Sequence, residues 1–215
     1  MLDFSNLLEN KMSKIRSLIT AAIIIAPCAS HAITFDFNDL LQQNGNGSYA
    51  IGSEYLSSGF SFKGTPSFPS DFSKFYVQQV QSQLWTGSQA LTYYGVGALI
   101  EFKSKIGTPF QAVSIDLSRG DGNTSLIPVL FTGIKSNGSQ VTATYWFTDS
   151  IKGKNTTFAF GPAFTNLLAL NWNQGAEWHQ FDNLSISTVP ESSSAWYLSL
   201  GLAIFAAVTY KRRAA

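Results

Sequence analysis

Residues 129–148 read Val-Leu-Phe-Thr-Gly-Ile-Lys-Ser-Asn-Gly-Ser-Gln-Val-Thr-Ala-Thr-Tyr-Trp-Phe-Thr, the pattern of two strands joined by a tight turn. Ser136-Asn137-Gly138-Ser139 supplies the Asn-Gly pair that a two-residue hairpin turn favours, because both central residues of that turn take positive φ. Polar and apolar residues alternate through the second half, as in a strand with one buried face. This stretch predicts a β-hairpin.

Similar alternating runs, separated by Gly, Asn, Pro and Ser, occur along the rest of the chain. The apolar members expected to face the core are Ile33, Phe35, Phe37, Phe60, Phe62, Ala98, Ile100, Phe102, Val113, Ile115 and Leu117. Only residues 72–89 resemble a short helix, and their β-branched and aromatic content argues against one. The pattern predicts an all-β fold, a single antiparallel β-sandwich that is jelly-roll-like, with no internal repeat.

The composition is that of an extracellular β protein. Aromatic residues make up 14% of the chain and charged residues 13%, and the formal net charge is +1. No basic stripe appears in the body, which argues against nucleic acid as a partner. The single cysteine, Cys28, lies in the N-terminal segment, so the body has no thiol for a disulfide, a nucleophile or a metal site.

The two ends look like targeting segments. Residues 1–32, with a possible start at Met12, combine Lys and Arg with an apolar stretch and a small-residue site at Ser30-His31-Ala32, which predicts a secretory signal peptide. A lipidated Cys28 is the less favoured alternative, because Pro27 precedes it. The body would then span residues 33–187, the size of one domain.

The last segment, 188–215, contains Val189-Pro190-Glu191, an uncharged apolar stretch at 195–210, and Lys211-Arg212-Arg213. The stretch is marginally long enough to cross a membrane, and the basic cluster predicts that its C-terminal end stays in the cytoplasm. The alternative is an amphipathic helix packed on the body, which the lack of a polar face disfavours.

This tail resembles the PEP-CTERM sorting signal of exported proteins in exopolysaccharide-producing Gram-negative bacteria. The resemblance covers Val189-Pro190-Glu191, residues 195–210 and Lys211-Arg212-Arg213, and departs from the family where Ser192 replaces a frequent second proline. It implies signal peptidase and the Sec machinery as partners, transient anchoring in the inner membrane, processing by an exosortase-like membrane protease, and delivery to the cell surface or beyond.

Catalytic residues are hard to assemble in the body. His179 is its one histidine once His31 leaves with the signal peptide, and no Gly-x-Ser-x-Gly elbow is present. The remaining route to glycoside hydrolysis is a pair of carboxylates among Glu54, Glu101 and Glu177. The sequence around these residues gives no sign of such a pair. We therefore expect no enzyme activity.

Calcium is the one cofactor that the sequence suggests. Asp36, Asn38 and Asp39 follow the first strand, and Asp182 lies in the last, which in carbohydrate-binding jelly rolls often lies near the first. Carboxylate and amide oxygens suit calcium. The alternative, which we favour, is that these are solvated turn and cap residues.

The clearest binding candidate is Trp146. Period two places Thr142, Thr144, Trp146 and Thr148 on one face of a strand, and an indole among hydroxyls suits the apolar side of a sugar ring. Trp178 is expected to join this site, and Trp85, Tyr93, Tyr94 and Trp172 could extend the platform. The alternative, which we favour, is that Trp146 is buried under a loop or against the second sheet, as large aromatic residues usually are.

Together these features predict an exported cell-surface or extracellular-matrix β-sandwich, sorted through its tail, non-catalytic and binding exopolysaccharide. A secreted glycan-active enzyme and a permanently membrane-anchored structural protein are the alternatives.

Overall fold

The computed structural model describes residues 31–40, 47–68, 73–80, 82, 84–94, 97–120, 128–147, 153–173 and 179–188. Residues from His31 to Val189 form one compact unit. Residues 1–30 of the predicted signal peptide, the Pro-Glu motif, the apolar stretch at 195–210 and the terminal basic cluster lie outside the described residues, as do Thr148 and Trp178. The last two residues of the predicted signal peptide, His31 and Ala32, are described and begin the first strand.

The described residues form thirteen strands, all paired antiparallel, and one 3-10 turn, η1 (Asn38–Leu40). The first sheet has the order β2-β5-β6-β13-β8-β11, and β1 pairs with β13 beyond β6. Its strands are β1 (His31–Phe35), β2 (Ser48–Gly52), β5 (Phe75–Gln78), β6 (Ala90–Tyr93), β8 (Phe110–Arg119), β11 (Thr156–Ala159) and β13 (His179–Thr188).

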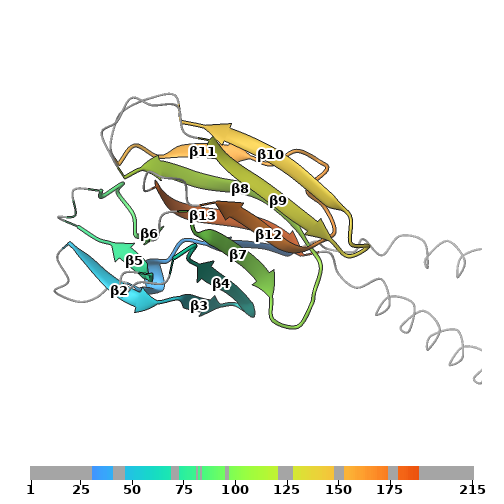
Figure 1. Ribbon diagram of the computed structural model, residues 1–215, viewed down its shortest axis with the longest axis horizontal. Helices are drawn as coiled ribbons and strands as arrows, with labels where there is room; N and C mark the ends of the chain where they lie inside the picture. Colours follow the sequence, from blue (N-terminus) through green and yellow to red (C-terminus); the bar gives the residue numbers. More distant parts are fainter. Residues whose placement is uncertain are drawn as a thin grey trace, which may run out of the picture. The chain divides into compact units, whose positions relative to one another are not determined.

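The second sheet has the order β3-β4-β7-β12-β9-β10 (Figure 1). Its strands are β3 (Glu54–Ser57), β4 (Phe60–Thr65), β7 (Leu99–Ser104), β9 (Pro128–Lys135), β10 (Gln140–Trp146) and β12 (Leu167–Asn173). One register pair, Leu167 with Phe110, joins β12 to β8 and so links the two sheets at a corner. The fold is therefore a sandwich-like, nearly closed antiparallel β structure, and the predicted all-β antiparallel class is confirmed.

Eight strands pair in a nested order. β1 pairs with β13, β7 with β12, β8 with β11, and β9 with β10, so the first strand of the set meets the last and the innermost two form a hairpin. The remaining strands, β2 to β6, fall between β1 and β7 in the sequence and widen both sheets.

Aromatic rings fill the space between the sheets. Phe35 of β1 packs edge-on against Phe60, Phe62 and Phe102 of the second sheet, with ring centroids 5.2 to 5.6 Å apart. The ring centroids of Phe181 of β13 and Trp172 of β12 lie 5.0 Å apart. Edge-to-face pairs add to the burial of large apolar surfaces, which is the main stabilising term in a domain without disulfides.

The hairpin at 129–148 forms as predicted, but its turn differs from the predicted one. Gly138 has a φ of 81°, whereas Asn137 stays out of the positive region. The Asn137 side chain instead accepts hydrogen bonds from the backbone N and the hydroxyl of Ser139, at 3.0 and 2.7 Å. A three-residue loop, residues 136–138, closed by the Lys135 and Ser139 backbones therefore replaces the two-residue turn.

As its β-branched and aromatic content indicated, the described part of residues 72–89 holds strand β5 and turns, not a helix, and Phe75 and Val77 alternate inward with Tyr76 between them. One expectation about the core was wrong. Val113 was expected in the core but is 42% exposed. The register between β8 and β13 shifts near this point, so Ala112 rather than Val113 faces inward.

Gly64 of β4 gives the first test of this packing. A Cβ at this position would lie 2.0 Å from Cε2 of Tyr93, whose buried ring is held by Phe75 and by a hydrogen bond from its hydroxyl to the Ser73 carbonyl. We expect Gly64→Ala to lower the free energy of unfolding by about 1–3 kcal/mol in urea titrations. Gly161→Ala, where a Cβ meets nothing within 4 Å, is the control, and equal stability of the two variants would contradict this account.

Candidate functional site

The outer surface of the second sheet carries the predicted tryptophan, and we call it the Trp146 face. Side chains that point away from the core on five adjacent strands make it up: Thr142, Thr144 and Trp146 of β10, Leu130 and Thr132 of β9, Asn171 and Asn173 of β12, Leu99, Glu101 and Lys103 of β7, and Lys63 and Thr65 of β4. β3 adds Glu54 beside Lys63.

Strand β10 presents Trp146 to solvent. Exposed and half-buried residues alternate along the whole strand, so Tyr145 turns inward while Trp146 turns outward and is 50% exposed. This exposure excludes the alternative of a tryptophan buried under a loop or against the first sheet. Trp146 lies opposite Pro128, and Thr144 lies opposite Leu130, itself 46% exposed.

Two asparagines of β12 continue the face next to β9. The Asn173 Oδ1 atom accepts a 2.6 Å hydrogen bond from the backbone N of Leu130, which leaves its Nδ2 group as a donor. The Asn171 Oδ1 atom is buried and has no hydrogen-bond partner among the described residues. The Asn173 Nδ2 group is therefore a remaining donor beside the exposed Leu130, whereas the buried Asn171 oxygen is out of reach of a ligand on this surface.

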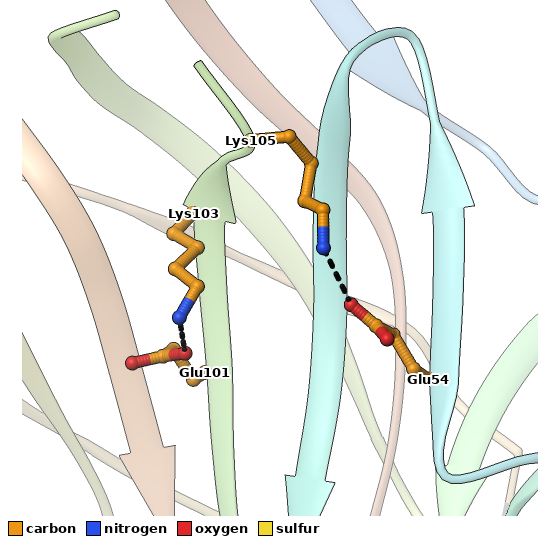
Figure 2. A network of polar contacts seen from close by, with 4 residues as sticks. All are labelled: Glu54, Glu101, Lys103 and Lys105. Atoms are coloured by element: carbon orange, nitrogen blue, oxygen red, sulfur yellow. Dashed lines mark hydrogen bonds and ion pairs between the residues drawn. The ribbon is translucent and has the colours of Figure 1, made fainter. Parts of the chain in front are cut away.

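Charged residues occupy the far side of the face, on β7, β4 and β3. Lys103 Nζ lies 2.6 Å from Glu101 Oε1, and Lys105 Nζ lies 3.2 Å from Glu54 Oε1 (Figure 2). Both carboxylates are therefore engaged in ion pairs. This argues against their use as the acid and base of a glycosidase, which need a free carboxylate and a protonated one.

The structure separates the other predicted platform residues from this face. Trp172 and Tyr93 are fully buried in the core, so neither can contact a ligand there. Tyr94 packs against Tyr76 of the first sheet at 4.5 Å, and Trp85 lies half-buried in the connection between β5 and β6. Their aromatic character gave no means of telling which sheet each would join.

Sequence reasoning missed the neighbours of Trp146. Leu130, Asn173, Leu99 and Lys63 come from four strands, and only the strand order brings them together. The alternating pattern predicted that each strand has an outer face, but not which strands are adjacent.

The register of β1 with β13 brings Asp36 close enough to Asp182 for its charge to act on that carboxylate, whereas Asn38 and Asp39 lie in the turn η1. Asp36 accepts a hydrogen bond from the Asn38 backbone and shapes the turn after β1, while both Asp39 carboxylate oxygens accept from the Tyr55 hydroxyl at 2.8 Å. Asp182 lies on β13. Within the described part of the chain, no group of three or more His, Cys, Asp or Glu residues is arranged to hold a metal. Calcium binding stays a prediction.

Asp182 is a fully buried carboxylate on the first sheet, directly opposite Asp116 of β8. It accepts hydrogen bonds from the Ser88 hydroxyl and, at 2.7 Å, from the Asn183 backbone N. Burial, followed by the charges of Asp116 and Asp36, raises the pKa of Asp182 to about 6, although these hydrogen bonds act in the other direction. Like charges directly opposite each other in a sheet are destabilising.

His179, the candidate catalytic histidine, is buried at the start of β13, with its ring centroid 6.0 Å from that of Phe147. Burial lowers the pKa of His179 to about 3, so the ring is neutral near pH 7. The guanidinium of Arg119, also buried, lies 5.8 Å from the Phe147 ring centre.

Comparisons with known proteins give a likeness of fold only. No family model matches the chain, and neither does any curated protein. Among solved structures, a family 29 carbohydrate-binding module from Piromyces equi aligns with 10% identity and a TM-score of 0.42, covering 74% of this chain and 91% of the module. A variant of such a module in complex with mannohexaose aligns with 11% identity and a TM-score of 0.44, covering 74% and 93%. At these values the likeness fixes neither family nor function.

Within the part of the chain that the structure describes, no helix has the length and apolar character needed to cross a membrane. The predicted helix at 195–210 lies outside that part.

The buried Asp182 predicts a specific dependence of stability on pH. Its folded-state pKa, about 6, exceeds its ordinary value of 3.8, so the folded state binds more protons between these values and stability falls as pH rises through them. From about pH 4 to about pH 7, wild type should lose about 2 kcal/mol more unfolding free energy than Asp182→Asn. Asp116→Asn should reduce the loss, and parallel pH profiles for wild type and Asp182→Asn would contradict the assignment.

Proposed function

We propose that the protein is a non-catalytic carbohydrate-binding module and that the Trp146 face is its binding surface. The observation that carries the proposal is a half-exposed tryptophan on an open sheet, with Thr144 on the same strand and Leu130 on the next. An indole ring covers the apolar face of a sugar, while hydroxyl and amide groups bind the hydroxyls around the ring. The spare Nδ2 group of Asn173 and the exposed Thr144 hydroxyl supply such groups.

We further infer a jelly-roll fold. A jelly roll is a long hairpin of eight strands wrapped into two sheets, so its first strand pairs with its last and the pairs nest inward. The pairs β1–β13, β7–β12, β8–β11 and β9–β10 follow this order, and the other five strands then form an insertion between the first and second jelly-roll strands.

We also propose that the module works at the cell surface or in an extracellular matrix, with exopolysaccharide as its ligand. This part rests on the resemblance of Val189-Pro190-Glu191, residues 195–210 and Lys211-Arg212-Arg213 to the PEP-CTERM tail. The tail would hold the exported protein transiently in the inner membrane until an exosortase-like protease removes it.

The binding proposal is tested with Trp146→Ala. Loss of a central aromatic contact typically costs about 2 kcal/mol or more, so we expect retention on the native exopolysaccharide to weaken by roughly tenfold or more. Val113→Ala removes another exposed apolar side chain, on the first sheet, and should bind as wild type does. Unchanged retention of Trp146→Ala, with both variants folded by circular dichroism, would rule out this site.

The sorting proposal is tested by the intact mass of the mature protein recovered from its native host. We expect a mass that begins near Ile33 and ends near Glu191, because the signal peptide and the tail are removed. A mass that retains residues 195–215 would identify a permanent membrane anchor and would overturn the exosortase proposal.

A further inference from the structure

Lys63 is the unpaired charge of the Trp146 face. Its register partners are Glu54 on β3 and Glu101 on β7, one on each side. Each of these carboxylates is engaged by a different lysine, Lys105 or Lys103 (Figure 2). Lys63 is exposed, and among the described residues no carboxylate lies within ion-pair distance of its ammonium group.

The apolar side chains of the face lead from Trp146 toward this lysine. Leu130 and Leu99, each 46% exposed, occupy the same register row, with Asn173 between them on β12. Lys63 is the diagonal neighbour of Leu99, two residues from its partner Thr65. Four inter-strand spacings separate β10 from β4, and the registers offset Trp146 from Lys63 by four residues along the strands, so the two residues lie roughly 20–25 Å apart.

We propose that the Trp146 face binds a linear acidic polysaccharide that crosses the strands, with a sugar ring on Trp146 and a uronic acid carboxylate on Lys63. This inference rests on the carbohydrate-binding function proposed above and specifies its ligand class. The row between the two residues alternates apolar contacts at Leu130 and Leu99 with the Asn173 amide. An extended sugar chain likewise alternates apolar ring faces with hydroxyl groups.

Charge complementarity favours an acidic ligand over a neutral one. A charge-assisted hydrogen bond between an ammonium and a carboxylate is about twice as strong as a neutral one. The two glutamates of the face would repel an acidic chain if they were free, but their ion pairs with Lys103 and Lys105 reduce that repulsion. With Lys105 counted through its ion pair with Glu54, the face carries three lysines and two glutamates, one cation more than anions.

The test measures binding of the full-length chain, in mild detergent, to immobilised polymers by biolayer interferometry. Polygalacturonate, alginate and hyaluronate are each compared with their carboxyl-reduced products, which keep the backbone and lose the charge. We expect an acidic polymer to bind more tightly than its reduced product, and added NaCl to narrow the difference because salt screens exposed charges.

Two variants of Lys63 and one control variant test whether this side chain causes the preference for acidic polymers. Lys63→Gln should weaken binding of the acidic polymer roughly three- to tenfold and leave the reduced polymer unaffected. Lys63→Arg should retain most of the acidic preference. Lys74→Gln makes the same charge change at an exposed lysine before β5, on the first sheet, and should behave as wild type.

The outcomes separate this proposal from the function on which it rests. If Trp146→Ala lowers binding but acidic and reduced polymers bind alike, or Lys63→Gln matches Lys74→Gln, the face binds glycans without the acidic preference and the present proposal fails. If no polymer binds, acidic or neutral, and native exopolysaccharide is not retained either, both proposals fail. A dimer in light scattering that Trp146→Ala dissociates would show that a second copy covers the face instead.

Discussion

The packing of aromatic rings between the two sheets is the constraint on which the rest of the structure depends. The described body has no cysteine, so the sheets are held together by burial and by contacts such as those of Phe35 with Phe60, Phe62 and Phe102. Side chains alternate strictly along a strand, so a ring fixed inward fixes its neighbours outward. The ring centroid of Tyr145 lies 5.9 Å from that of Phe158 in the opposite sheet, and Trp146 must therefore face solvent.

Local pattern was enough to predict the class of fold. The alternation around Phe35, Phe62 and Phe102 correctly identified strands and their buried faces, because burial of one sheet face imposes a period of two. Prediction was wrong where tertiary pairing decides the outcome. Val113 turns outward because the register between β8 and β13 shifts, and Asn137 avoids positive φ because its side chain closes the turn. Neither effect can be seen in the alternation of a single strand.

The candidate site was predictable only in part. Trp146 could be placed on an outer face from its own strand, since Tyr145 and Phe147 lie on the other side of it. Its partners could not, because Leu130, Asn173 and Lys63 become neighbours through the order β10-β9-β12-β7-β4, which is set by pairing between distant segments. Trp172 shows the converse. Its aromatic side chain suggested a platform residue, yet its contacts with Phe131 and Phe181 place it in the core.

Among the described residues, β10 pairs only with β9 and β3 only with β4, so the second sheet ends in an open edge on both sides. A polymer bound there as proposed would meet no further strand among the described residues at which its chain must end. The Trp146 face would therefore select internal stretches of a long chain over chain ends, and several copies of the protein could bind along one polymer molecule. In a gel, each polymer molecule would offer many such binding stretches to many copies of the protein. The time for which a protein stays bound would then grow with its local density, beyond the residence time of a single contact.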